Sequence, residues 1–425
     1  MNFDETQMKT IDMSSVSYKI IALIALGAMA LGKDIRSGKN GPMSGGLFPI
    51  DSDDDKFEEI AQFAAKDIGS EFTLDSVEDA KAQLLDETAE DSNIQPQRSL
   101  NVSGWNMAEG GRILIMDGGG IRGLVMLEIL EAIEKKAGQP IQQLFDWIGG
   151  TSTGGIIALG IATGKSVSHI RNIYYKLKDQ VFTGSTPYDS EVLEKLLKEQ
   201  FGETSVMTDI IHPKVLITGV LGDHRPWKLH MFRSYMKGYK QAEKGFYRIK
   251  PPNEQFIWET ARSTSAAPSY FHPYNQFLDG GLMSNNPTLD ILAEIHEFKK
   301  EQTKKADSGR SLDVVVSLGC GHVDHIPVTV PDLTSGGVGA IIPWLNFAKD
   351  VLYQVSISDG QPTNRASAWC EMMNVPFFRL SPLLTEDVPL NCVDKQKLEQ
   401  MIQKTKSYIG EQMDSITKIA QYLKR

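Results

Sequence analysis

The feature that most constrains this chain is a single serine, Ser152, with Gly150 two positions before it and Gly154 two positions after it. An apolar run at residues 144–148 precedes this motif, and a second apolar stretch at 156–162 follows it. A serine that attacks acyl groups needs its oxygen clear of the backbone, which a sharp strand-to-helix turn with flanking glycines provides. We therefore expect a strand, a nucleophile-elbow turn and a helix, although an ordinary glycine-rich turn has the same residue pattern.

The chain beyond Gly111 alternates short apolar runs with stretches of helical periodicity. The apolar runs that we expect to form buried strands are residues 113–116, 215–220 and 314–318. The stretches whose apolar spacing indicates helices are residues 124–136, 167–178 and 190–200. Uninterrupted apolar runs are typical of parallel strands buried on both faces. The sequence therefore predicts an α/β fold with a largely parallel sheet that helices cover on both sides.

Negative charge is concentrated ahead of this region. Residues 51–91 hold fifteen acidic side chains against three lysines, a balance of −12, so the overall charge of −10 leaves +2 for the rest of the chain. A near-neutral remainder argues against nucleic acid as a partner, because that partner needs a basic face, and it leaves an anionic membrane open. Residues 34–56 mix Gly, Ser, Pro and Asp, which is typical of a linker. We expect an N-terminal part at 1–107 and a main domain at 108–425.

The cysteines and the longest N-terminal apolar run indicate in which cellular compartment the protein works and whether it spans a membrane. The three cysteines are widely spaced and lack a metal-ligand pattern, so we expect free thiols in a reducing, cytoplasmic compartment. We predict no metal site, since the aspartate-rich residues 51–55 are followed by Lys56 where a calcium loop needs glycine. The apolar run at 20–31 has twelve residues, too few for the roughly twenty that cross a bilayer.

A second glycine-rich turn follows the predicted strand at 113–116. It consists of Asp117, Gly118, Gly119, Gly120, Ile121, Arg122 and Gly123. This spacing matches a dinucleotide-binding turn with Asp146 as the candidate ribose ligand, but the carboxylate of Asp117 would repel a pyrophosphate. Glycine amides at a helix N-terminus suit an oxyanion hole better, because they are unobstructed and the helix dipole favours negative charge there. Arg122 either braces the loop or attracts a phosphate head group.

The serine also needs a proton acceptor. His322 and His325 follow in the chain order of an α/β-hydrolase triad, but they lie in an apparent loop without a catalytic context. Asp279 ends a short apolar run, and Gly280 and Gly281 after it let the backbone approach another loop closely. A carboxylate suffices as a general base if it contacts the serine directly and is partly desolvated.

Taken in order, these motifs resemble the patatin-like phospholipases, and within them the ankyrin-bearing calcium-independent phospholipase A2 subgroup. The similarity extends to residues 145–147, 266–268, 285–290, 368–371 and 378–380. The resemblance covers about residues 110–425 and implies a three-layer α/β/α catalytic domain with a mostly parallel central sheet. It implies that Ser152 is the nucleophile and Asp279 the base. It further implies an oxyanion hole at Gly118, Gly119 and Gly120, with motif support from Arg122, Gly123, Gly150, Gly154, Gly280 and Gly281. The N-terminal part departs from the subgroup, since it shows no ankyrin repeats.

The activity implied by this resemblance is calcium-independent hydrolysis of the sn-2 acyl ester of glycerophospholipids through an acyl-enzyme on Ser152. No cofactor is implied. A broader lysophospholipase, thioesterase or acyltransferase uses the same dyad, and a dinucleotide-binding oxidoreductase or a non-catalytic lipid-binding protein remains open from other classes.

The expected partner is a phospholipid membrane surface, which makes the protein peripherally membrane-associated. Residues 338–349 combine aromatic and aliphatic side chains and are a candidate for insertion at the interface. Residues 395–425 have helical apolar spacing interrupted by lysines, which favours a covering helix over a calmodulin-target helix. A homo-oligomer is also compatible with this sequence.

Overall fold

The structure is a computed structural model that describes residues 110–237, 249–303, 312–324 and 356–424, together with residues 347, 350, 351, 353 and 354. The expected N-terminal part at 1–107, His325 and the candidate interfacial segment 338–349, apart from Phe347, lie outside the described residues. The proposed boundary at residue 108 therefore stays a prediction.

A seven-stranded sheet organises the described residues. Its order is β4 (Lys228–Arg233), β3 (Lys214–Leu221), β2 (Trp147–Thr151), β1 (Arg112–Met116), β6 (Val314–Leu318) and β7 (Phe377–Leu380), with β5 (Phe277–Asp279) paired to β3. The pairs β3–β2, β2–β1, β1–β6 and β6–β7 are parallel, whereas β4 and β5 run antiparallel to β3. The prediction of a mostly parallel sheet is confirmed, and the three predicted strands are β1, β3 and β6.

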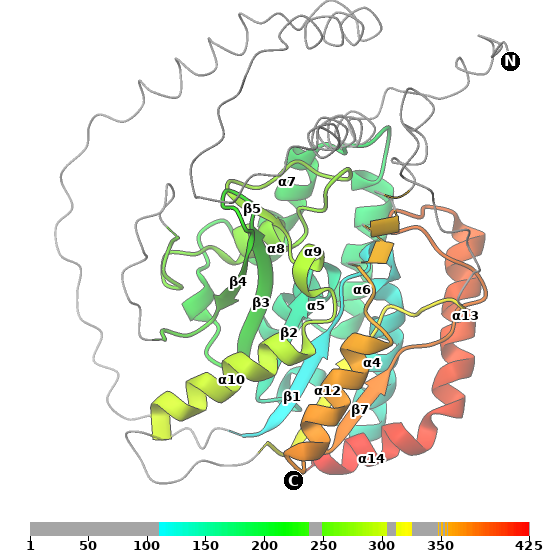
Figure 1. Ribbon diagram of the computed structural model, residues 1–425. Coiled ribbons are helices and arrows are strands. Elements are labelled where there is room, and N and C mark those ends of the chain that lie inside the picture. Colours follow the sequence, from blue (N-terminus) through cyan, green and yellow to red (C-terminus); the bar gives the residue numbers. More distant parts are fainter. Residues whose placement is uncertain are drawn as a thin grey trace, which may run out of the picture. The chain divides into compact units, whose positions relative to one another are not determined.

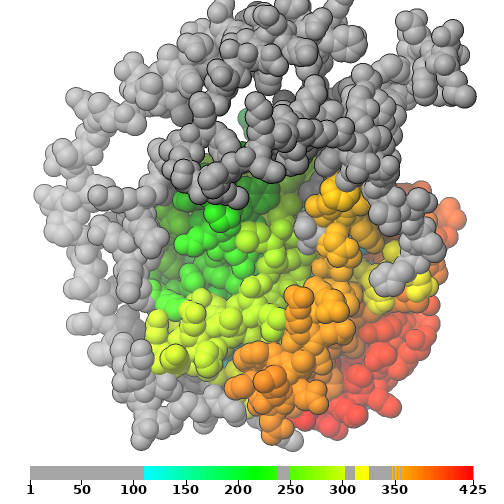
Figure 2. Space-filling model, viewed as in Figure 1, coloured from blue at the N-terminus to red at the C-terminus, as the bar shows by residue number. Residues whose placement is uncertain are grey.

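Alternation along the buried strands divides the interior into two cores, one on each face of the sheet. In β1, Leu114 and Met116 belong to one core, whereas Ile113 and Ile115 belong to the other. The first core is covered by α4 (Gly123–Ala137), α5 (Thr153–Ala162), α6 (Val167–Lys176), α7 (Ser190–Phe201) and α8 (Ile257–Thr264). The second is covered by α10 (Thr288–Thr303) and α12 (Gln361–Met372), which pass in front of the sheet in Figure 1 and lie side by side on the surface in Figure 2. These layers confirm the expected α/β/α architecture.

Strand β2 begins later than the apolar run at 144–148 suggests. It starts at Trp147 and includes both glycines that precede the serine, Gly149 and Gly150. A Cβ added at Gly149 would lie 2.3 Å from Cδ1 of Ile291 on α10, so the glycine lets that helix pack directly on the strand. The strand therefore extends to the turn itself.

The C-terminal residues form two helices, α13 (Lys395–Glu411) and α14 (Met413–Leu423), instead of the one covering helix predicted for 395–425. Both pack against α4, and the break between them at Gln412 lets each helix turn an apolar side toward it. The buried residues are Leu398, Met401, Ile416, Ile419 and Leu423. The covering role is confirmed, while the calmodulin alternative stays a prediction. None of the helices in the described ranges has the length and hydropathy needed to cross a bilayer.

Candidate active site

The register of three strands brings Ser152 and Asp279 together. Thr151, the last residue of β2, pairs with Thr218 of β3, and the next residue of β3, Gly219, pairs with Asp279 of β5. Strands β2 and β5 therefore occupy the same edge of β3 one after the other, with their carboxyl ends facing each other. The hydroxyls of Thr151 and Thr218 lie 2.6 Å apart in the interior at this junction.

Ser152 occupies the sharp turn between β2 and α5 that the elbow motif predicts. Its backbone has φ 52° and ψ −119°, a left-handed conformation that is costly for a residue with a Cβ. The backbone N–H of Ser152 donates to Oγ1 of Thr264 at 2.8 Å, and its Oγ donates to Oδ2 of Asp279 at 2.7 Å. The turn thus holds the hydroxyl clear of the backbone and against a carboxylate.

Asp279 is buried, with 6% of its surface exposed. Its second oxygen, Oδ1, accepts a hydrogen bond of 2.7 Å from the N–H of Gly281. Burial raises the pKa of Asp279 to about 6, although the hydrogen bonds from Ser152 and Gly281 act in the opposite direction. A carboxyl group with this pKa is ionised at neutral pH and is a much stronger base than an exposed aspartate.

The glycine loop lies beside the serine. A Cβ added at Gly118 would come within 3.4 Å of the Cβ of Ser152. The N–H of Gly118 already donates to the carbonyl of Asn285 at 3.0 Å, whereas no acceptor among the described residues binds the N–H groups of Gly119 and Gly120. Gly120 has φ +57°, which glycine adopts without strain. Of the three amides expected to form an oxyanion hole, two are therefore available.

The glycines that support the motifs stand where the backbone segments approach closely. A Cβ added at any of these positions would lie within 2.7 Å of another atom; they are Gly123, Gly150, Gly154, Gly280 and Gly281. Arg122 makes a contact of 3.5 Å with the carboxylate of Asp387 and no hydrogen bond to a described carbonyl. Attraction of a phosphate by Arg122 therefore remains a prediction.

A cavity of about 600 Å³ opens beside Ser152 and Asp279. Glycines 119 and 120 line it together with Ser152 and Asp279, so the dyad and the two unpaired amides face one space. Its apolar walls include Ile156, Leu177, Phe182, Leu193 and Phe271. A cavity of this size and polarity suits a long acyl chain.

The structure rejects the candidate ribose ligand. The carboxylate of Asp146 binds Arg112 through both oxygens, at 2.7 Å and 2.9 Å. Asp146 precedes β2 and Arg112 begins β1, so this pair lies at the amino ends of the strands, opposite the edge that carries Ser152. Asp117 is likewise buried, and its carboxyl group is paired with Arg379 of β7.

His322, the alternative base, has a different partner from Ser152. Nδ1 of His322 lies 3.6 Å from Oδ2 of Asp359, beyond the end of β6, while the hydroxyl of Ser152 donates to Asp279. His322 is therefore a loop histidine, as its sequence context indicates.

Three residues of the site were not assigned a role from the sequence. Thr264 binds the backbone of Ser152, Asn285 binds the N–H of Gly118, and Arg379 binds Asp117. The stretches 285–290 and 378–380, which carry two of them, stood out only as part of the family resemblance. Their partners are more than a hundred residues away in the chain, so no local pattern indicates these contacts.

The family model and two sequence relatives that match this chain are all described as phospholipases. Residues 114–292 match the family described as patatin-like phospholipase. The 85/88 kDa calcium-independent phospholipase A2 of Rattus norvegicus is 42% identical over 329 residues, which are 73% of this chain and 40% of the rat protein. The intracellular phospholipase A2 of Caenorhabditis elegans is 32% identical over 381 residues, 88% of this chain and 34% of the nematode protein. The chain thus spans less than half the length of these relatives.

Among solved structures, VipD from Legionella pneumophila aligns with 70% of this chain and 67% of its own, with a TM-score of 0.30 and 11% sequence identity.

Proposed function

Because this chain carries a patatin-like phospholipase domain, matched over residues 114–292, we propose that it hydrolyses the sn-2 acyl ester of glycerophospholipids without calcium. The observation that carries the proposal is the hydrogen bond of 2.7 Å from Ser152 Oγ to the buried carboxylate of Asp279, at the wall of an apolar cavity. The names of the rat and nematode relatives, both phospholipases A2, support the same reaction, and the name of the rat relative supports the independence from calcium.

The proposed reaction passes through an acyl-enzyme. Asp279 takes the proton of the Ser152 hydroxyl as Oγ attacks the ester carbonyl carbon, and the N–H groups of Gly119 and Gly120 stabilise the oxyanion. The tetrahedral intermediate collapses, and Asp279 returns the proton to the departing oxygen of the lysophospholipid. Water then repeats the sequence on the acyl-enzyme: Asp279 takes its proton, the fatty acid leaves, and the serine regains its hydrogen.

The test is product analysis on a phosphatidylcholine labelled in its sn-2 chain, with a calcium chelator present. We expect release of labelled fatty acid and unlabelled lysophospholipid, and covalent capture of Ser152 by a fluorophosphonate probe. Release of the sn-1 chain or transfer of the label to an added acyl acceptor would favour the lysophospholipase or acyltransferase alternative. A chain that neither reacts with the probe nor cleaves the lipid would refute a serine hydrolase of any kind.

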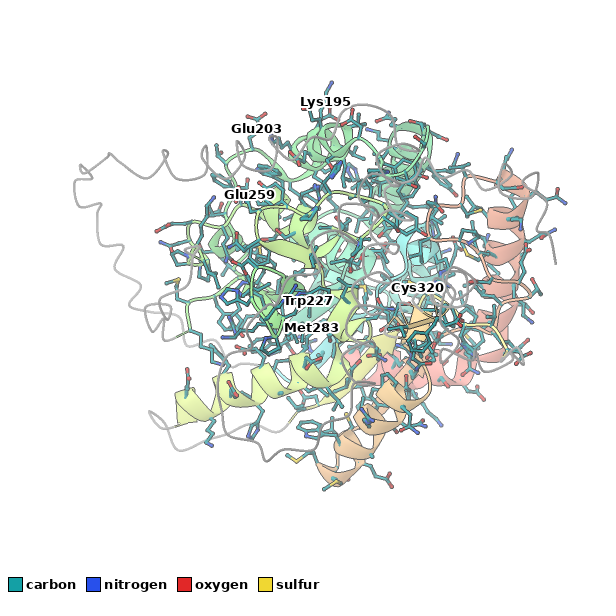
Figure 3. The ribbon with its side chains drawn as sticks, turned by 45° about the horizontal axis from the view of Figure 1, so that its top comes forward. Lys195, Glu203, Trp227, Glu259, Met283 and Cys320 are labelled. Atoms are coloured by element: carbon teal, nitrogen blue, oxygen red, sulfur yellow. The ribbon has the colours of Figure 1, made fainter. Side chains whose placement is uncertain are left out.

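We also place the protein in the cytoplasm, in peripheral contact with a phospholipid surface. The three cysteines, Cys320, Cys370 and Cys392, are free and buried, which suits a reducing compartment. Exposed apolar side chains occur near the carboxyl ends of the strands, at the edge of the sheet that carries Ser152. Trp227, in the β3–β4 connection, and Met283, on α9 (Gly281–Ser284), are each 47% exposed and are labelled in Figure 3. Tyr353 is 57% exposed and lines the cavity.

Replacing Trp227 with alanine is expected to weaken binding to anionic phospholipid vesicles by about tenfold. Trp227 stands between the exposed cations Arg225 and Lys228, an arrangement that suits the boundary between head groups and acyl chains. Vesicle co-sedimentation measures the effect. The control is Met372→Ala, since Met372 is 86% exposed at the end of α12, at the opposite edge of the sheet. Equal losses in both variants would contradict a directed membrane surface.

A further inference from the structure

We propose that Arg379 is a positioning residue, which holds the glycine loop in the orientation that the oxyanion hole requires. This inference rests on the proposed function, and it assigns a task to a buried charge network outside the Ser152–Asp279 dyad. Arg379 does not line the cavity, and its side-chain hydrogen bonds go to Asp117, Ser317 and Asp359 instead of the dyad, so its effect on the reaction would pass through the backbone of the loop.

The guanidinium of Arg379 reaches from β7 across β6 to the end of β1. Its Nη1 donates to Oγ of Ser317 at 2.9 Å, and its Nε donates to Oδ1 of Asp359 at 2.9 Å. Its Nη2 donates to Oδ2 of Asp117. A Cβ added at Gly319 would lie 2.6 Å from Nη2, so the glycine in β6's extension makes room for this crossing. One side chain thereby ties three segments at the carboxyl edge of the sheet.

Asp117 is the residue through which Arg379 acts on the loop. Its side chain is fully buried, and it directly precedes Gly118. Its backbone N–H donates to the carbonyl of Leu318 at 3.0 Å, and its carbonyl accepts from the N–H of Gly154, in the first turn of α5, at 3.1 Å. Burial raises the pKa of Asp117 to about 7, while Arg379 acts in the opposite direction, and the hydrogen bond from Arg379 fixes the position of the Asp117 side chain. The peptide before the glycine loop is therefore fixed relative to both the sheet and the serine helix.

A second route fixes the other end of the same peptide. The N–H of Gly118 donates to the carbonyl of Asn285, whose side-chain amide donates to Oγ of Ser358 at 2.7 Å. The next residue, Asp359, is the second carboxylate bound by Arg379. These contacts close a ring around the Asp117–Gly118 peptide. The N–H groups of Gly119 and Gly120, which have no acceptor among the described residues, follow directly after this ring in the chain.

An oxyanion hole works by preorganisation, because its donors must already point to the position where negative charge develops. Glycine itself imposes little direction on the Gly119 and Gly120 amides, so their orientation depends on hydrogen bonds that fix the neighbouring peptides, among them the Asp117–Gly118 peptide. Loosening the ring at Arg379, which does not line the cavity, would leave substrate binding intact, while the transition state would lose hydrogen bonds. The expected signature is a lower kcat with little change in KM.

The experiment compares the same substitution at two partly buried arginines, each paired with an aspartate. Arg379→Lys keeps the charge but replaces the planar fork that binds two carboxylates and a hydroxyl at once. We expect a fall in kcat of about 10²-fold with KM within about twofold, which is the scale for loss of one oxyanion donor. The matched control is Arg112→Lys, which loosens the Arg112–Asp146 ion pair at the opposite edge of the same sheet and should retain kcat.

A second measurement separates positioning from general loosening. A fatty acyl trifluoromethyl ketone forms a tetrahedral oxyanion on Ser152, whereas an ether-linked phospholipid analogue only fills the cavity. Arg379→Lys should lower the affinity for the ketone by about the same factor as it lowers kcat/KM. The affinity for the ether lipid should stay unchanged. If Arg379→Lys does not fold, Asp359→Asn cuts the same ring while keeping the Asp117–Arg379 pair, and a smaller, similar pattern is expected.

Unchanged kcat in Arg379→Lys, or equal losses for the ketone and the ether lipid, would overturn the proposal. So would a loss of kcat in Arg112→Lys as large as in Arg379→Lys. The proposed function fails in a different way: wild-type protein would then lack lipid hydrolysis, or Ser152→Ala would retain it.

Discussion

Ser152→Ala is expected to lower kcat for phospholipid hydrolysis by at least about 10⁴-fold, because no acyl-enzyme can form without the hydroxyl. Substrate binding should persist, since the cavity walls supply most of the apolar contact and the substitution removes only one oxygen. Stopped assays on labelled phospholipid vesicles measure kcat, and an ether-linked analogue measures binding. Residual activity close to that of the wild type would exclude Ser152 as the nucleophile.

The matched control for this serine lies in the same cavity. Ser265 also lines it, but its Oγ donates to the carbonyl of Ala261 at 2.8 Å and not to Asp279. Ser265→Ala should therefore keep kcat within a few fold. Ser152→Gly adds a second check: it should be as inactive as Ser152→Ala but more stable by about 1 kcal/mol, because glycine relieves the left-handed backbone of the turn.

The sequence predicts those features of the site that depend only on residues adjacent in the chain. The elbow at Ser152 requires only a strand, a turn and a helix in succession, and the flanking glycines indicate all three. The apolar runs likewise predict β1, β3 and β6, since burial on both faces leaves a continuous apolar segment. The bounds of β2 do not follow from its apolar residues, because the strand includes Gly149 and Gly150, and the close packing of α10 on Gly149 is a contact between distant segments.

No local sequence pattern indicates which distant segments of the chain pair with each other. Asp279 meets Ser152 because β5 continues the edge of β3 just beyond β2, a register that residues 277–279 alone do not encode. Family resemblance, not periodicity, supplied that aspartate as the base. The same resemblance assigned three loop amides to the oxyanion hole, but the N–H of Gly118 is bound by Asn285, 167 residues away, which leaves two. Long-range hydrogen bonds decide which backbone groups stay free.

The rate of the reaction is expected to depend on the ionisation of Asp279. Only the carboxylate can accept the proton of Ser152, and its pKa is about 6. The value of kcat/KM should therefore rise tenfold per pH unit below pH 6 and level off above it. In Ser152→Ala the pKa of Asp279 should be higher still, because the serine hydrogen bond stabilises the carboxylate. Nuclear magnetic resonance titration of the labelled carboxyl carbon measures both values, and a kinetic midpoint near pH 4 would contradict this assignment.

Asp279→Asn should lower kcat by about 10³- to 10⁴-fold, through loss of the base, and at the same time stabilise the fold at neutral pH. Because the folded-state pKa of about 6 exceeds the ordinary 3.8, the folded protein keeps a proton that the unfolded chain has lost between these values. Stability falls as pH rises through this window, by about 3 kcal/mol in total, and the penalty persists above pH 6. Asparagine keeps the acceptor for Gly281 and carries no charge, so it removes the penalty. Chemical denaturation should show the variant to be more stable than the wild type at pH 7.5 and equal to it near pH 4; equal stability at both would mean that the buried carboxylate imposes no cost on the fold.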